Sequence, residues 1–154
     1  MEFQTLPGHA VSRECRSRGR APVSPERQVL VGYRLERARQ TLEEAKLLLD
    51  AGHTNACVNR LYYACFYAVS ALLLTQNLST SKHSHARALL HRDYIKPGHV
   101  SKEMGDHYDL LFDSRQKGDY EDLVVFDAER VRLWLEPTKS FVDHIARFIA
   151  RDTQ

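Results

Sequence analysis

Residues 59–74 of the chain read NRLYYACFYAVSALLL. They make up most of a helix that we predict over about 55–76. This helix is apolar nearly all round, which is typical of the central helix of a bundle. The uninterrupted apolar part, 64–74, is shorter than the roughly 18 residues that a membrane-spanning helix needs. We therefore expect a buried core helix and no membrane association.

Helical periodicity continues on both sides of this stretch, and no segment has the alternation of a β-strand. Upstream, leucine and alanine recur at three- and four-residue intervals from Val31 to a closing Gly52. Thr54 or Asn55 is expected to cap the central helix. The remaining expected elements are a short helix over 85–92, a helix from Ser101 to about 116, a loop over 117–123, and a last helix capped by Asp127. This order predicts an all-α, up-and-down bundle of four to five helices.

The last helix contains a proline, Pro137, inside its apolar pattern. A proline in a helix interior removes one hydrogen bond, and its ring clashes with the carbonyl four residues earlier. We therefore expect a continuous helix that kinks near Leu133. Trp134 belongs to the same apolar pattern and is expected in the core.

The first 28 residues differ in composition from the rest. They carry five arginines and three prolines and show no apolar period. We interpret 1–28 as a flexible tail and 29–151 as the bundle domain. An arginine-rich tail that contacts RNA is an alternative interpretation. The formal net charge of the 154 residues is only +2, so overall charge gives no argument for binding nucleic acid or a membrane.

Cysteine is sparse, with Cys15, Cys57 and Cys65. The last two are separated by about 12 Å along one expected helix, which is beyond the reach of a disulfide. Free thiols in an apolar helix indicate a reducing compartment. We therefore expect a cytoplasmic protein.

The central helix holds one arginine among apolar residues, Arg60, and Tyr63 and Tyr67 share its face. An unpaired buried arginine is costly, so Arg60 must reach a carboxylate, a partner chain or an anion. One interpretation is structural, with Arg60 paired inside the bundle or extended into solvent. The other is functional, with Arg60 binding a phosphate-bearing ligand in a cleft. The spacing alone leaves both open.

Three elements, in family order, resemble the HEPN superfamily, in particular its small stand-alone members. The matching elements are the signature helix 59–74, Lys82-His83, and Arg115 with Asp119-Tyr120. The resemblance covers about 31–149. It implies a four- or five-helix bundle, usually dimeric, with the signature arginines near the dimer cleft. Many HEPN proteins are metal-independent ribonucleases, and many are toxins paired with a small nucleotidyltransferase-like antitoxin.

The family's ribonuclease motif is an arginine followed, after four to six residues, by a histidine. The arginine would stabilise charge on the phosphate, and the histidine would move protons near neutral pH. Here six residues follow Arg60 and Tyr67 stands at the histidine position. A phenol is a poor base at pH 7, although it can donate a hydrogen bond to a phosphate. Arg60 and Tyr67 are therefore the candidate catalytic residues, with weak or absent cleavage expected.

The same resemblance adds further candidates for ligand binding. Asn59 matches the polar position beside the family arginine and is expected to orient Arg60, and Tyr63 lies on the same face. His83 is a candidate remote proton carrier. Asp119, expected in the loop before the last helix, would pair with a bundle arginine, either Arg60 or Arg115, or, alternatively, belong to a solvated acidic turn.

Metal binding has little support in the sequence. His83, His85 and His91 lie close together, but no cysteine or carboxylate completes a likely ligand set. We expect neither a metal nor a cofactor.

Three functions remain open at this point. The first is a HEPN toxin or RNA-processing subunit, homodimeric, acting on RNA with a nucleotidyltransferase-like antitoxin. The second is a non-catalytic dimeric module whose arginine cleft holds a nucleotide or a protein. The third is a purely structural helical dimer. Tyr67 at the histidine position argues against the first, and an internally paired Arg60 would favour the third.

Overall fold

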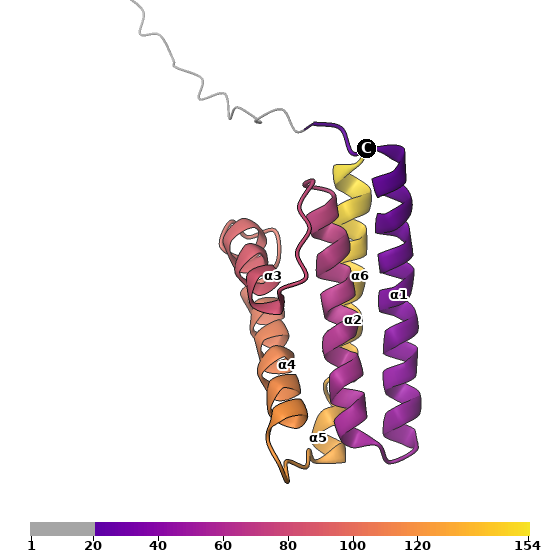
Figure 1. Cartoon of the computed structure of the whole chain (residues 1–154), viewed down its shortest axis with the longest axis vertical. Helices are drawn as coiled ribbons and strands as arrows, with labels where there is room; N and C mark the ends of the chain where they lie inside the picture. The colour runs from indigo at the N-terminus through magenta and orange to yellow at the C-terminus, as the bar shows by residue number, and fades with distance from the viewer. Residues whose placement is uncertain (1–20) are drawn as a thin grey trace, which may run out of the picture.

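The computed structural model describes residues 21–154, and the regular elements in that range are all helical (Figure 1). The predicted all-α fold is therefore confirmed. Four long helices form the bundle: α1 (Pro25–Asp50), α2 (Thr54–Leu74), α4 (Lys102–Tyr120) and α6 (Leu135–Asp152). The shorter elements are α3 (His83–Leu90), the π-helical turn η1 (His91–Ile95) and α5 (Ala128–Arg132).

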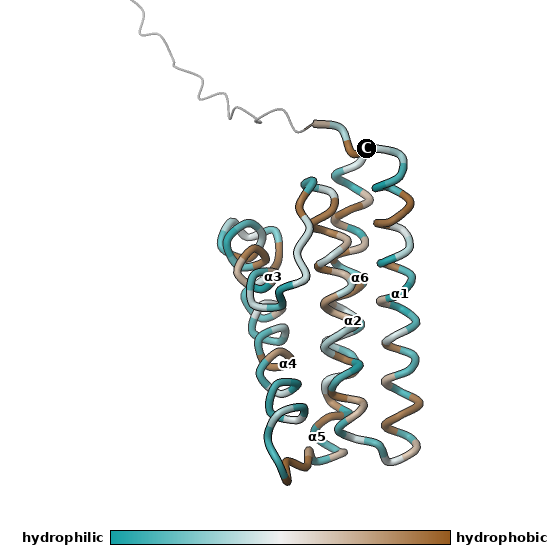
Figure 2. The backbone as a smooth tube through the Cα atoms, viewed as in Figure 1, coloured by the Kyte–Doolittle hydropathy of each residue, from teal (hydrophilic) through white to brown (hydrophobic). Residues whose placement is uncertain are grey.

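Helix α2 lies at the centre and packs against α1, α3, α4, α5 and α6. In Figure 1, α1 and α4 flank α2 on opposite sides, and α6 runs behind it. By length and composition α2 could cross a membrane, but most of it is buried among the other helices. In Figure 2, α1 alternates between hydrophilic and hydrophobic residues along its length, as expected for a helix with one buried face.

The core lies where the long helices face one another. Its largest fully buried side chains include Tyr62 of α2, Tyr108 of α4 and Phe141 of α6. Trp134 is also buried, as predicted. Cys57 is a free, buried thiol whose pKa is raised to about 11 by burial, so it is chemically inert near neutral pH.

Serine and aspartate side chains cap three of the helices. The hydroxyls of Ser24 and Ser101 and the carboxylate of Asp127 accept from the backbone N–H three residues ahead. The cap at Ser101 is as predicted, whereas Asp127, expected to cap the last helix, caps the short helix α5 instead. Helix α1 begins at Pro25, earlier than the expected Val31, because Ser24 caps it and proline suits the first position of a helix.

The boundary between the expected tail and the bundle lies close to this helix start. Residues 25–28, assigned to the tail, belong to α1. The greater part of the tail, 1–20, lies outside the described residues, and so does Cys15.

The start of α2 differs from expectation. Its N-cap is His53, without a side-chain cap, and neither Thr54 nor Asn55 has that role. The Asn55 amide instead donates to the carbonyl of Val124 at 2.7 Å and accepts from the N–H of Phe126 at 3.2 Å. Asn55 therefore holds the segment between α4 and α5 against the start of α2.

Helix α4 is longer than expected, and the predicted loop over 117–123 is wrong for its first part. The helix continues to Tyr120, so Asp119 lies in its last turn rather than in a loop. Arg115 pairs with Asp119 at 3.1 Å across one helical turn, and Asn59 of α2 also donates to Asp119. The ion pair within α4 and the contact from α2 both favour an additional turn that apolar periodicity alone does not reveal.

The expected kink in the last helix is also wrong, because the chain breaks into two helices. After α5, the N–H groups of Leu133 and Trp134 donate to carbonyls three residues back, at 3.1 and 2.9 Å. Helix α6 then begins at Leu135, which places Pro137 in its first turn. A proline has no missing hydrogen bond at that position, so it starts a new helix instead of bending an old one.

Candidate functional site

One side of α2 receives polar side chains from both flanking helices and from the start of α3. The residues that meet there are Arg37, Glu44, Asn59, Arg60, Tyr63, Tyr67, His83, Arg115 and Asp119. We call this set the arginine surface. It contains all six residues singled out in the sequence as catalytic or ligand-binding candidates.

A chain of polar contacts runs across the arginine surface from α1 to α4. Arg60 donates from Nε and Nη2 to the side-chain oxygen of Asn59, at 3.2 and 2.8 Å. The Asn59 amide donates to Asp119 at 3.3 Å, and Arg115 Nε donates to the same carboxylate oxygen at 3.1 Å. On the other side, Glu44 of α1 lies 3.7 Å from Arg60. The predicted pairing of Asp119 with a bundle arginine is confirmed, and that arginine is Arg115.

The ring of Tyr63 lies close to two guanidinium groups. The central carbons of Arg60 and Arg115 are 5.0 and 5.3 Å from the ring centroid. Both distances are within the range of a cation–π interaction. Arginines from α2 and α4 thus both contact one aromatic side chain. The Arg60 side chain is 28% exposed and that of Arg115 only 10%, so Arg60 is the more accessible of the two cations.

Arg60 is neither fully paired nor fully free. Its side chain is 28% exposed. Asn59 and Glu44 account for three of the five N–H groups that a guanidinium carries. The others have no hydrogen-bond partner in the described part of the chain. The structural interpretation of Arg60 is therefore met in part, because Arg60 contacts Glu44 of α1, while phosphate binding by its remaining donors stays a prediction.

The charges on this surface do not cancel. Three arginines, including Arg37 of α1, face two carboxylates, which leaves one positive charge in excess. An excess of positive charge beside half-exposed tyrosines favours an anionic ligand over a cationic one.

His83 begins α3 and places its ring against the arginine surface. Its Nδ1 is 2.7 Å from the hydroxyl of Tyr62, and its ring centroid is 4.4 Å from that of Phe66. Burial lowers the pKa of His83, and the positive charge of Arg115 lowers it further. His83 is therefore neutral at pH 7 and able to accept a proton.

Tyr67 occupies the position two turns after Arg60. Its ring is 6.0 Å from that of Tyr63, and the guanidinium carbon of Arg37 is 5.5 Å from its centroid. Arg37 in turn pairs with Glu44 at 3.1 Å. The nearest arginine to Tyr67 among these contacts is thus supplied by α1 and not by its own helix.

Three members of the surface were not singled out as site residues from the sequence. Arg37 and Glu44 lie on α1 among charges that resemble an ordinary solvated helix face. Arg115 belongs to a family element and is one of the two arginines expected to pair with Asp119, but the sequence does not make it a predicted site residue. The seven-residue interval between Arg37 and Glu44 places them on one face, but only the packing of α1 against α2 shows what that face meets.

The histidines after α2 do not converge. His85 contacts the hydroxyl of Thr80 at 3.2 Å, and His91 contacts Asp109 of α4 at 2.9 Å. Within residues 21–154, no group of three or more histidine, cysteine or acidic side chains has the arrangement to hold a metal ion.

The structure is that of a helical bundle protein with arginine and tyrosine side chains grouped on its central helix. The model of the HEPN domain matches residues 31–148. That match covers well over half of the chain, so the chain belongs to the HEPN domain family. It supports the resemblance seen in the sequence.

Similar proteins occur in bacteria and archaea. The chain is 44% identical over 124 residues to a "UPF0332 protein" of Thermotoga maritima, covering 80% of this chain and 94% of that protein. It is 29% identical over 113 residues to "Putative toxin MJ0605" of Methanocaldococcus jannaschii, covering 73% and 84%. It is 26% identical over 115 residues to "Putative toxin MJ0142" of the same organism, covering 75% and 78%. This chain is thus related to proteins that carry the name of toxins.

Proposed function

We propose that this chain is a toxin-type HEPN protein that acts on RNA, and that its arginine surface binds RNA phosphates. The observation that carries the proposal is the pair of guanidinium groups, Arg60 and Arg115, that both lie within cation–π distance of Tyr63. Guanidinium groups bind phosphate through two parallel, charge-assisted hydrogen bonds. The names of the archaeal relatives support the toxin part of the proposal.

Two protein partners belong to the same proposal. One is a second copy of the chain, because Tyr63, Phe66 and Tyr67 leave an aromatic stripe of α2 only partly covered. The other is a nucleotidyltransferase-like antitoxin in the cytoplasm. Sedimentation at micromolar concentration tests the homodimer. Induced expression with and without the neighbouring gene tests the antitoxin, which should relieve any growth arrest.

Replacing Arg60 by alanine is expected to weaken binding of a short single-stranded RNA by about tenfold or more, because charge-assisted hydrogen bonds to phosphate are lost. The slope of log affinity against log salt concentration should become shallower by the contribution of about one phosphate contact. Fluorescence anisotropy with a labelled oligonucleotide at two salt concentrations measures both effects.

Arg39→Ala is the matched control, since Arg39 also lies on a bundle helix but is 52% exposed, and the one ion pair it makes within residues 21–154 is with Glu36 of the same helix. It should change RNA binding by less than about twofold. Circular dichroism should show nearly unchanged helix content for both variants. Loss of the fold in Arg60→Ala would show that Arg60 is a structural ion-pair partner and would contradict the proposal.

A non-catalytic binding module is the second candidate function. It is favoured by Tyr67 at the position of the family histidine and by the internal contacts of Arg60 with Asn59 and Glu44. Such a module would bind RNA or nucleotide through the same arginines but leave the RNA intact. An RNA cleavage assay in excess chelator separates the two functions.

A further inference from the structure

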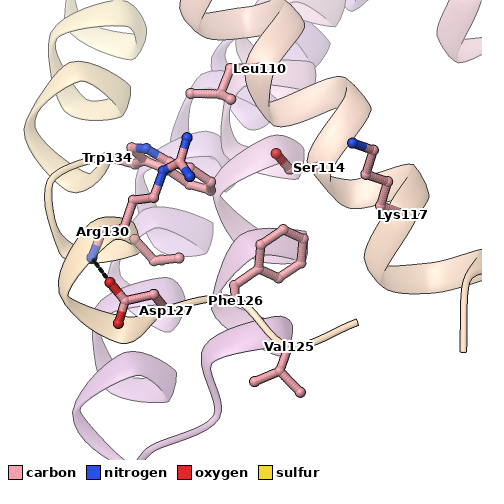
Figure 3. Close-up of a pocket in the computed structure, with 9 residues that line it drawn as sticks. Leu110, Ser114, Lys117, Val125, Phe126, Asp127, Arg130 and Trp134 are labelled. Carbon is pink, nitrogen blue, oxygen red and sulfur yellow. Dashed lines mark hydrogen bonds between the residues drawn. The ribbon is translucent and has the colours of Figure 1, made fainter. Parts of the chain in front are cut away.

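A pocket of about 370 Å³ lies at the end of the bundle where α4 meets α5, and its lining shares no residue with the arginine surface (Figure 3). Its size is at the lower end of the range of small-molecule sites. The lining residues come from α4, from the segment before α5, and from α5 and the turn after it: Leu110, Ser114, Lys117, Val125, Phe126, Asp127, Arg130, Val131 and Trp134. Residues Ser114 and Lys117 of α4 do not belong to the contacts described for RNA.

The inside of this pocket is apolar and aromatic. The rings of Phe126 and Trp134 meet edge to face with centroids 6.3 Å apart. Leu110 and Val131 add aliphatic surface. In Figure 2 the segment between α4 and α5 is a run of hydrophobic residues, and Val125 on it is 85% exposed. This combination suits a flat apolar body that enters from solvent.

The polar groups around the pocket are mostly donors. In Figure 3, Arg130 extends beside Trp134 on one side, and Lys117 lies on the opposite side. Neither cation has an ion pair or a side-chain hydrogen bond within the part of the chain that is described. The one carboxylate, Asp127, already accepts from the backbone N–H of Arg130 at 3.3 Å. The rim is thus complementary to a negatively charged group.

The pocket is held open by contacts in its wall. Asn55 binds the backbone of this segment on both sides of Val125. Gly118 of α4 has no side chain, which lets the ring of Phe126 approach it, since a Cβ there would lie 3.1 Å from that ring. Phe126 is therefore positioned before any ligand arrives, which lowers the entropic cost of binding.

We propose that this pocket binds a small aromatic carboxylate, with its ring against Phe126 and Trp134 and its carboxylate between Lys117 and Arg130. The proposal is independent of RNA binding. The aromatic pair provides apolar burial for the ring, and the two cations select an anionic head group over a neutral one.

Trp134 is the only tryptophan in the chain, so its fluorescence reports directly on the pocket. We expect 3-phenylpropionate to change this emission in a saturable way. The neutral analogue 3-phenylpropionamide should bind about tenfold more weakly, because it lacks the charge that the two cations attract. The double variant Lys117→Gln/Arg130→Gln should lose about tenfold in affinity for the acid and bind the amide as the wild type does.

The matched control is Arg147→Gln/Arg151→Gln, which removes two exposed positive charges from the far end of α6. It should leave the affinity for the acid within about twofold of the wild type. Three results would overturn the proposal: no saturable change in emission, equal affinity for acid and amide, or equal losses in the two double variants. Circular dichroism of all forms confirms that the comparison is made on folded protein.

Discussion

Acidifying the protein from pH 7 to about pH 4 is expected to lower its free energy of unfolding by about 3 kcal/mol through one side chain, His107. Burial lowers the pKa of His107 from its ordinary 6.5 to about 4. Between these two values the unfolded chain binds a proton that the folded chain does not. Stability therefore falls as the pH falls through this window, and it is fully restored above about pH 6.5.

Burial disfavours the protonated form of His107, and its hydrogen bond to Thr138 fixes which ring nitrogen carries the proton in the neutral form. The hydroxyl of Thr138 donates its proton to the carbonyl of Trp134 at 2.7 Å, so it can only accept from Nε2 of His107, 2.9 Å away. The neutral ring therefore carries its proton on Nε2. A second proton must go onto Nδ1, and burial penalises the resulting charge.

Urea unfolding at several pH values between 7 and 4 measures the effect. His107→Gln is the informative variant, because glutamine keeps an N–H donor for Thr138 and does not titrate in this range. We expect the variant to be somewhat less stable at pH 7 but to lose much less stability on acidification. An equal loss in both proteins would mean that other groups, His83 first among them, dominate the acid response.

Local signals in the sequence predict the starts of α4 and α5. Ser101 and Asp127 cap α4 and α5 as their residue types indicate, because each side chain needs only a backbone N–H three residues ahead. The apolar pattern of α2 likewise predicts its burial. These features depend on residues that are close together in the chain, and a single sequence contains all the information on such neighbours.

The sequence-based predictions that are wrong concern features that depend on residues distant in the sequence. Asp119 remains helical because Asn59 of α2 and Arg115 hold it, and periodicity contains no information on Asn59 as a partner. Asn55 looks like a cap but binds the backbone beside Phe126, far along the chain. Pro137 correctly predicts where the helical pattern is disturbed. Whether the proline kinks a helix or starts a new one depends on the turn at Leu133.

The candidate site also combines features that local sequence predicts with features that depend on the packing of distant helices. The helical spacing of Arg60, Tyr63 and Tyr67 predicts that they share a face, and they do. Their approach to His83 and Arg115 follows from the packing of α3 and α4 on α2, and the sequence suggested it only through the family resemblance. Arg37 is recognised as a member of the site only once the structure shows that α1 packs next to Tyr67.

Replacing Tyr67 by histidine is expected to raise metal-independent RNA cleavage by about 100-fold, the increase typical of adding a positioned general acid or base. A phenol is a poor base at pH 7, whereas an imidazole near its ordinary pKa exchanges protons readily. Tyr67 lies beside Arg37, and the positive charge of Arg37 would lower the pKa of an imidazole at this position and keep it neutral. The wild type should therefore cleave weakly or not at all.

The measurement is cleavage of a labelled RNA in excess chelator by the wild type, Tyr67→His and Tyr67→Phe. The phenylalanine variant removes the hydroxyl without adding a base, so it should stay at the wild-type level while the histidine variant gains. Brisk cleavage by the wild type would contradict the expectation and show that Tyr67 is no obstacle. The proton would then have to move through another group, and His83 is the neutral base already present on the arginine surface. In that case His83→Ala should abolish cleavage while RNA binding through Arg60 persists, because the two residues would perform separable steps, proton transfer and phosphate binding.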